Sequence, residues 1–238
     1  SCRQFNQQLL PINPGDDTLV EVRVAPNSNT YGIAAHLAQV GLIRSSNTFV
    51  WYCRLNGYDS QLQAGLYRFS RKQGIPEIVE DLIDGKVVTN KITIPEGYDL
   101  RQIGELFVAE GICSAEEWKA AINRDYDFIF VRDIPQRDNR LEGFLFPDTY
   151  QIKEGTRPED LIELMLRRFS SVWNQQFAEM AKDQGLTPYR VITMASMIEK
   201  EGRHDEERAR IAGVIFNRLK EGMPLQIDAT VLYSLGEH

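Results

Sequence analysis

The sequence predicts an α+β protein made of two small strand–helix–helix–strand units, the second of which continues into a helical part. Short runs of strand type, with apolar and polar residues in alternation, occur in both halves of the 238-residue chain. Each run is followed by helical segments with capping residues in front and glycine behind. After residue 158 the apolar residues recur at helical spacing.

The first unit is predicted between residues 18 and 88, after a polar lead-in at residues 1–17. Apolar and charged residues alternate over 18–25, which indicates a strand with one solvent-exposed face. Its elements are, in order, this strand, a short helix closed by Gly41, a helix capped by Ser45 or Ser46, a turn and strand at 62–69, and a helix at 76–84 stopped by Gly85.

The same order of features recurs about 70 positions further on. A strand and proline turn recur at 92–97, a helix with its glycine stop recurs at 100–111, and Ser114 and Glu117 open the next helix as a capping box. Segment 141–146 then corresponds to 63–67 of the first unit, and the helix start at 155–159 corresponds to the one at 74–77. Matched features in one order indicate a duplicated unit.

The rest of the chain is predicted to be mainly helical. We expect a long amphipathic helix over 158–181, a helix from Thr187 to Gly202, and a helix over 205–220. Residues 223–238 begin a further element.

Composition excludes several classes of function. A net charge of −7 argues against nucleic acid as the main partner. We expect no membrane-spanning segment, because no run of about 18 apolar residues occurs. The three cysteines and three histidines are scattered, so we expect no metal site and no cofactor. A phosphate-binding glycine loop and a nucleophile elbow are both missing from the sequence.

The helix at 187–202 ends in two glutamates, Glu199 and Glu201. Residues three, four and seven positions before Glu201 are Ile198, Met197 and Met194, whereas those before Glu199 are Ser196, Ala195 and Ile192, so Glu201 has the bulkier apolar neighbours on its own face. Apolar surroundings and the negative end of the helix dipole both predict a raised pKa for Glu201, as a general acid requires. The alternative is that both glutamates are ordinary solvated residues.

Two further segments carry polar groups suited to a sugar chain. Residues 141–150 place Glu142, Asp148 and Tyr150 among aromatic residues, and Asn217 precedes a segment with Gln226 and Asp228. Pyranose rings stack on apolar faces while their hydroxyls bond to carboxylates and amides. The alternative for 141–150 is that its aromatics fill the core. Carboxylate-driven cleavage of a glycosidic bond is the sharpest functional prediction.

Four blocks, LQAGLYRFS, LEGFLFPDTY, ITMASMIEKE and VIFNRLKEGMPLQIDATVLYSLG, resemble the YceG-like family of endolytic murein transglycosylases in the same order. The resemblance implies a LysM-like module at 18–88 and a YceG-like catalytic domain at 89–238 that lacks the family's C-terminal portion. It also implies a membrane helix before residues 1–17, hence a single-pass protein of the cytoplasmic membrane with its catalytic domain outside, the present piece being soluble.

The resemblance places the family's catalytic glutamate on Glu201, with Glu199 as the reserve candidate. It implies cleavage of the bond between N-acetylmuramic acid (MurNAc) and N-acetylglucosamine (GlcNAc) in peptidoglycan, leaving a 1,6-anhydro end. Candidates for binding the glycan or bracing Glu201 are Glu199, Glu142, Asp148, Tyr150, Asn217, Gln226 and Asp228. Implied partners are glycan strands and wall synthases such as penicillin-binding proteins. The alternatives are a scaffold without turnover, whose residues 18–85 bind carbohydrate or protein, and a hydrolase that leaves reducing ends.

Overall fold

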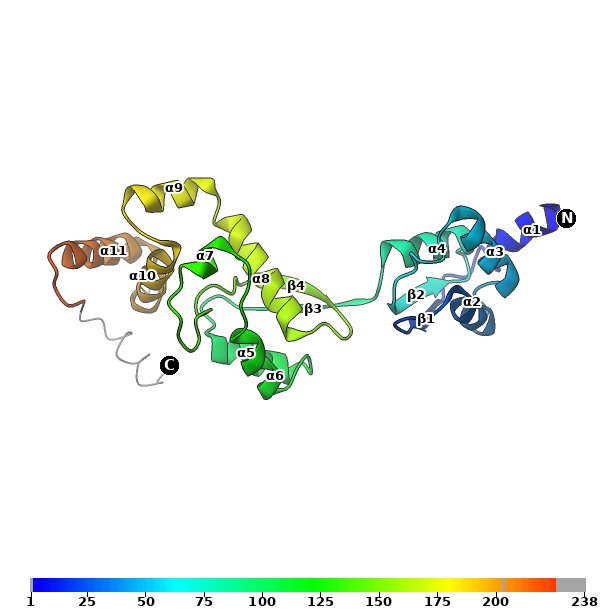
Figure 1. The fold of residues 1–238 in the computed structure, drawn as a ribbon, viewed down its shortest axis with the longest axis horizontal. Coiled ribbons are helices and arrows are strands. Elements are labelled where there is room, and N and C mark those ends of the chain that lie inside the picture. Colours follow the sequence, from blue (N-terminus) through cyan, green and yellow to red (C-terminus); the bar gives the residue numbers. More distant parts are fainter. Residues whose placement is uncertain (1, 203, 226–238) are drawn as a thin grey trace. The chain divides into compact units, whose positions relative to one another are not determined.

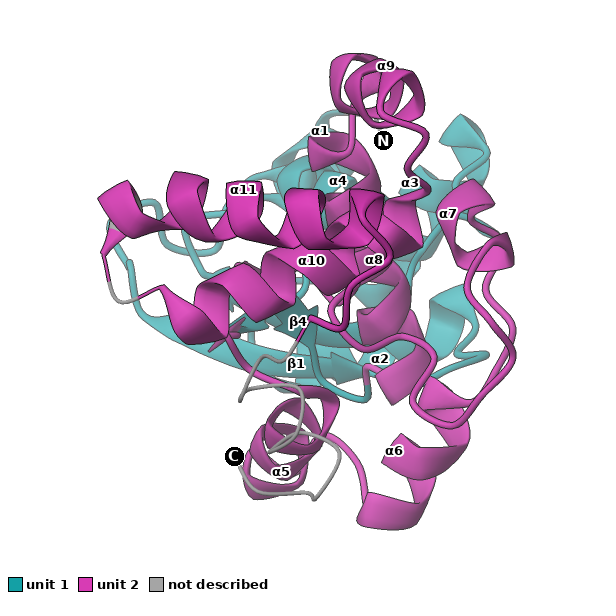
Figure 2. Cartoon of the chain, turned by 90° about the vertical axis from the view of Figure 1, so that its left-hand side faces the viewer, with its two compact units in different colours: residues 1–91, 151–155 teal, residues 92–150, 156–238 magenta. Residues whose placement is uncertain are grey.

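The computed structural model describes residues 2–202 and 204–225 and has the predicted α+β architecture, with helices and two small two-stranded sheets (Figure 1). The chain divides into two compact units (Figure 2). Unit 1 comprises residues 1–91 with 151–155, and unit 2 comprises residues 92–150 with 156–238. Among the described residues, no helix is both long enough and apolar enough to cross a bilayer.

Unit 1 contains an antiparallel pair of strands covered by helices. β1 (Leu19–Val24) pairs with β2 (Gly65–Ser70) so that Leu19 lies opposite Ser70 and Val24 opposite Gly65. The helices are α1 (Cys2–Leu9), α2 (Thr30–Gln39), α3 (Ser46–Asn56) and α4 (Ile75–Asp84). The core lies between sheet and helices and includes Val22, Leu37, Phe49, Tyr67 and Phe69. The strand–helix–helix–strand order predicted for this region is confirmed.

Unit 2 begins with the second sheet. β3 (Thr89–Thr93) pairs with β4 (Thr149–Lys153), and both strands contribute residues to each unit. Between them lie α5 (Leu100–Ala109), α6 (Ala115–Ile122) and α7 (Ile129–Arg132). The capping box predicted at Ser114 and Glu117 is present, since each accepts from the other's backbone N–H. Trp118 of α6 donates to the carbonyl of Leu100, which joins the two helices.

The prediction that 141–146 repeats the turn and strand of unit 1 is wrong. These residues form successive turns, and the second strand of the pair, β4, begins only at Thr149. Gly143 has a φ of +82°, which breaks the extended conformation that a strand needs. The side chains of Leu141 and Phe144 are fully buried, so the segment is a packed loop.

The single helix predicted over 158–181 is two helices. α8 (Pro158–Val172) ends before Trp173, and α9 (Gln175–Asp183) starts after Asn174. The side chain of Asn174 accepts from the backbone N–H of Phe177 at 3.1 Å. Asparagine competes for backbone hydrogen bonds in this way, and it favours a helix start over a helix interior.

The last two helices, α10 (Pro188–Glu201) and α11 (Asp205–Lys220), lie side by side (Figure 2). Their shared core is small: Met194 and Met197 of α10 and Ile215 of α11 are its buried members. The side chain of Thr187 caps α10 by accepting from the backbone N–H of Arg190 at 3.3 Å. The predicted element over 223–238 falls mostly on residues 226–238, outside the described residues.

Candidate active site

α10 carries both candidate acids, and its two long faces differ. The face with Met194 and Met197 is buried against α11, as the sequence pattern predicts. Glu201, however, is exposed. The expectation that apolar residues enclose Glu201 is therefore wrong for the described structure. Helical spacing explains the error, because shared position on a helix face does not say whether another element covers the end of that face.

Glu199 lies about 200° around the helix from Glu201, on the face that includes Ile192. A Cβ atom built on Gly97 would lie 3.6 Å from Oε1 of Glu199. A Cβ atom built on Gly143 would lie 2.7 Å from Cγ2 of Ile192. This face of α10 therefore lies directly against the turn before α5 and against the packed loop 141–146.

Glu142 belongs to that packed loop and reaches the start of α5. Both of its carboxylate oxygens lie 3.3 Å from the backbone nitrogen of Leu100, the first residue of α5, which donates to them. A carboxylate at this position also faces the positive end of the helix dipole. Residues 97–100 therefore have Glu199 on one side and Glu142 on another, which brings two of the predicted site residues to one turn.

Asp148 is held by an arginine and by the backbone. Its carboxylate accepts from the backbone N–H of Thr149 at 2.8 Å and from Nε of Arg168 at 2.7 Å. These bonds, the Thr149 one first, lower the pKa of Asp148 below its ordinary value of 3.8. The guanidinium of Arg168 also lies over the ring of Phe146, 5.3 Å from its centroid.

Replacing Asp148 with asparagine is expected to reduce the acid sensitivity of the fold. Since the folded-state pKa lies below 3.8, the carboxylate contributes stability above pH 3.8 that is lost as pH falls through the folded pKa. Urea midpoints measured from about pH 6 to about pH 2.5 should fall less steeply in Asp148→Asn than in the wild type. Asp138→Asn, at an exposed position, is the control, and equal slopes for both variants would contradict the assignment.

Tyr150 has the contacts of a structural residue. Its side chain is buried, and its hydroxyl donates to the carbonyl of Phe146 at 2.5 Å. Burial raises the pKa of this phenol. Phe144 and Leu145 are also buried, so the aromatic residues of 141–150 contribute mainly to the core, which was the alternative interpretation of this segment. Phe146 is the partly exposed aromatic residue of the segment.

The remaining predicted residues lie towards the C-terminal end. Asn217 is exposed on α11. Its neighbour Arg218 donates to the carbonyls of Pro224 and Leu225, at 3.2 and 2.6 Å, and so holds the chain after α11. Gln226 and Asp228 lie outside the described residues.

Sequence reasoning missed Gly97, Gly143 and Arg168. The two glycines follow a glutamate in similar contexts, PEGYDL and LEGFLF, and a lone glycine after a strand or within an apolar segment can signal close backbone approach. Arg168 gives no such signal, because an arginine at that helical position is ordinary.

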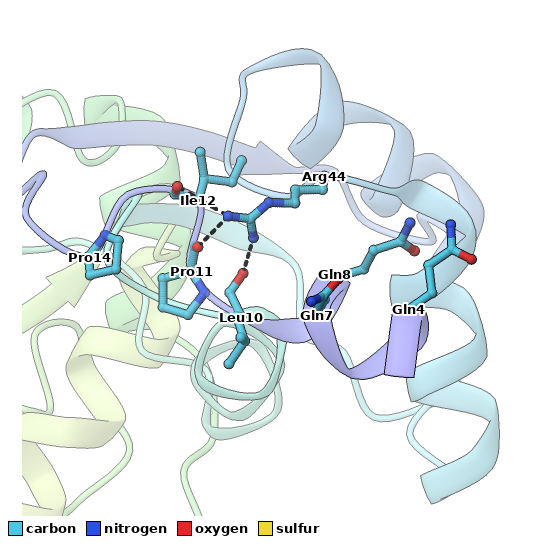
Figure 3. A pocket seen from close by; sticks show the side chains of 8 residues that line it. All are labelled: Gln4, Gln7, Gln8, Leu10, Pro11, Ile12, Pro14 and Arg44. Carbon is cyan, nitrogen blue, oxygen red and sulfur yellow. Dashed lines mark hydrogen bonds between the residues drawn. The ribbon is translucent and has the colours of Figure 1, made fainter. Parts of the chain in front are cut away.

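A cavity of about 640 Å³ occurs in unit 1, and its lining differs in chemistry from the carboxylate group around residues 97–100 (Figure 3). Arg44 closes one side by donating to the carbonyls of Leu10, Pro11 and Ile12, at 2.5, 2.7 and 3.2 Å. The lining residues are Gln4, Gln7, Gln8, Leu10, Pro11, Ile12, Pro14 and Arg44. With no carboxylate among these lining residues, the cavity cannot supply an acid. Within the described ranges, no group of His, Cys, Asp and Glu side chains is arranged to hold a metal ion.

Fold and site together define an α+β protein with carboxylates gathered around the turn before one helix and the end of another. The YceG-like family model matches residues 22–238, so the chain belongs to the YceG-like family.

Three relatives illustrate the family. An endolytic murein transglycosylase of Streptococcus pneumoniae (strain D39) is 33% identical over 254 residues, covering 96% of this chain and 45% of that protein. The Bacillus subtilis (strain 168) protein of the same name is 31% identical, covering 98% and 68%. The crystal structure of a YceG-like protein of Listeria monocytogenes has 30% identity and a TM-score of 0.54, covering 92% and 76%. The chain thus spans about half the length of the pneumococcal relative.

Proposed function

We propose that this protein is a lytic transglycosylase that cleaves the MurNAc–GlcNAc bond of peptidoglycan within glycan strands and leaves 1,6-anhydro-MurNAc ends. The observation that carries the proposal is family membership through residues 22–238, together with relatives that are named endolytic murein transglycosylases. The grouping of Glu199 and Glu142 beside residues 97–100 supports it, since a carboxylate-lined surface suits sugar hydroxyls.

In this proposal Glu201 is the general acid. It protonates the glycosidic oxygen between the two sugars, and the 6-hydroxyl of the muramoyl residue attacks its own anomeric carbon. The glycosidic C–O bond breaks, a new C–O bond closes the anhydro ring, and Glu201 takes the hydroxyl proton, which restores the acid without water. One carboxylate suffices because the intramolecular attack has a high effective molarity.

An exposed acid is compatible with this scheme if the glycan itself covers it. A bound strand displaces water from the carboxylate, and the removal of water disfavours the charged form. The low-dielectric surroundings that a general acid needs are then supplied by substrate. Glu199 and Glu142 are proposed to bind sugar hydroxyls or to fix the loop, and Asp148 and Asn217 to contribute at the edge of the strand. For Tyr150, the structural role described above is favoured.

The residue division at 88/89, the LysM-like character of residues 18–88, a membrane helix before them and wall synthases as partners remain parts of the proposal. So do the roles of Gln226 and Asp228. A LysM-like module would add a second contact to the glycan, which raises the effective concentration of the substrate at the acid.

Mass analysis of products from purified murein sacculi tests the proposal. The intact protein should release or create anhydro-MurNAc ends, which are lighter than reducing ends by one water. Reducing ends instead would indicate a hydrolase. Binding to sacculi without any new ends would indicate the scaffold alternative.

A further inference from the structure

Two glycines with left-handed backbone lie against one face of α10. Gly143 (φ +82°) faces Ile192, and Gly97 (φ +76°) faces Glu199. Ile192 and Glu199 are separated by two helical turns, so they lie in one line along the helix. Gly143 is not explained by its own turn alone, because it also leaves open the space that Ile192 of α10 occupies.

The contact at Gly143 is the tighter one. A Cβ atom there would lie 2.7 Å from Cγ2 of Ile192, closer than carbon atoms approach without one of them moving. At Gly97 the corresponding separation from the Glu199 carboxylate is 3.6 Å, an ordinary contact. A methyl group at 143 must therefore displace something, whereas a methyl group at 97 would only touch.

The loop that carries Gly143 is firmly held. Leu141 and Phe144, on either side, are fully buried. Arg140 is also buried, donating to the carbonyl of Val131 at 2.9 Å and pairing with Asp125 at 2.7 Å. A shift of the loop would break all of these contacts at once. A methyl group at position 143 is therefore expected to displace α10 and leave the loop in place.

α10 is held less firmly on its opposite side. The buried residues of its core with α11 are Met194, Met197 and Ile215. Methionine adapts its shape easily, so this core can accommodate a shift of the helix. Because a helix moves as a rod, displacement at Ile192 is carried to Glu199 and Glu201 at its end, about 10–14 Å away.

We propose that Gly143 is a positioning residue for the acid: its missing side chain lets Ile192 seat α10 on the 141–146 loop, and this seat sets where the glutamates at the end of α10 stand. Two turns further along α10, Glu199 lies beside Gly97 at an ordinary contact distance. The inference rests on the proposed function for its catalytic meaning, and on the Gly143–Ile192 contact for its geometry.

Gly143→Ala in the intact protein is the first test, with Gly111→Ala as the matched control. Gly111 also has a left-handed backbone (φ +68°), but nothing lies within 4 Å of its Cβ position. Both variants place an alanine in left-handed backbone, and only the methyl group of Gly143→Ala meets Ile192. Gly143→Ala is expected to lower kcat on sacculi by about tenfold to a hundredfold with KM little changed, as a misplacement of about 1 Å does. Gly111→Ala should stay near the wild-type kcat.

Rescue separates positioning from general damage. Adding Ile192→Ala to Gly143→Ala removes the colliding methyl group and should restore most of the lost kcat. Equal kcat for Gly143→Ala and Gly111→Ala, or a double variant no better than Gly143→Ala, would overturn the inference.

A second pair of variants approaches the contact from the helix and leaves the loop backbone unchanged. Ile192→Phe enlarges the residue in the seat, and Thr193→Phe adds the same ring at the exposed neighbouring position. Ile192→Phe should lower kcat as Gly143→Ala does, and Thr193→Phe should not. If Gly143→Ala does not accumulate as folded protein, Ile192→Phe and Thr193→Phe test the positioning role in its place. Equal kcat values for Ile192→Phe and Thr193→Phe would contradict a role of the Gly143–Ile192 contact.

Hydrogen–deuterium exchange gives a readout that does not need turnover. Backbone amides of 192–201 should exchange faster in Gly143→Ala than in Gly111→Ala, because α10 has lost its seat. If the wild type makes no new glycan ends, the proposed function fails while the exchange result still tests the contact. Equal exchange in the two variants, with an active wild type, overturns the positioning role alone.

Discussion

Glu201→Gln is expected to lower the rate at which new anhydro-MurNAc ends appear by roughly 10²–10⁴-fold, the range that one general acid contributes. Glutamine keeps the size and hydrogen-bonding shape of the side chain but has no acidic proton to give. Because Glu201 is exposed at the end of α10, the change should leave stability within about 0.5 kcal/mol of the wild type. The measurement is the time course of product masses from sacculi, with urea unfolding as the check on folding.

Glu199→Gln is the matched control, two positions away on the same exposed helix end. If Glu199 binds sugar or fixes the turn at Gly97, its loss should raise KM more than it lowers kcat. The reverse ranking, with Glu199→Gln inactive and Glu201→Gln active, would move the acid to Glu199. That outcome would agree with the contacts of Glu199 beside Gly97, and it would overturn the present assignment.

Local sequence signals predicted the elements well where the cause is local. Ser114 caps its predicted helix, Ser45 is the cap of the two candidates Ser45 and Ser46, and Thr187 caps the helix predicted to start there. These positions could be predicted because the capping bond joins a side chain to a backbone N–H only three residues on. The order of unit 1 followed from such signals with strand alternation. The family resemblance rested on sequence blocks, and family membership confirms it.

The failures come from contacts between distant segments. Residues 141–146 have a strand-like composition, but they form a loop in which Leu141 and Phe144 are fully buried and Gly143 lies against Ile192 of α10. The predicted helix over 158–181 is interrupted at Asn174, whose side chain caps the start of a second helix with a single hydrogen bond. Helical periodicity does not reveal such a bond. The exposure of Glu201 depends on whether another element covers the end of α10. The residues that share its helix face do not determine this.

In the candidate active site, too, some residues could be predicted from the sequence and others depend on contacts between distant segments. Sequence reasoning selected Glu142 and Glu199, and the structure brings both to residues 97–100, but Gly143, which makes room for Ile192 of α10, was not selected. A glycine's role as empty space is visible only once the neighbour that fills the space is known.

Phe144→Ala is expected to destabilise the protein by about 3–5 kcal/mol, as removal of a fully enclosed phenylalanine does. The ring of Phe144 is fully buried, stacks on Phe130 with centroids 5.8 Å apart, and meets Phe169 at 5.2 Å. Urea unfolding of the intact protein measures the loss. Phe177→Ala, at a side chain that is 50% exposed on α9, is the control and should cost less than about 1 kcal/mol.

This comparison decides between the two interpretations of the aromatic residues at 141–150. A core residue loses stability on truncation, whereas a residue of a sugar platform loses glycan binding and keeps stability. If Phe144→Ala unfolds at the wild-type urea concentration but no longer binds sacculi, the ring faces the glycan and the packed loop does not hold Gly143 in place. If it unfolds early, the same ring is what keeps the 141–146 loop rigid, and Glu142, Gly143 and the helix seated on them depend on an aromatic core that the substrate never touches.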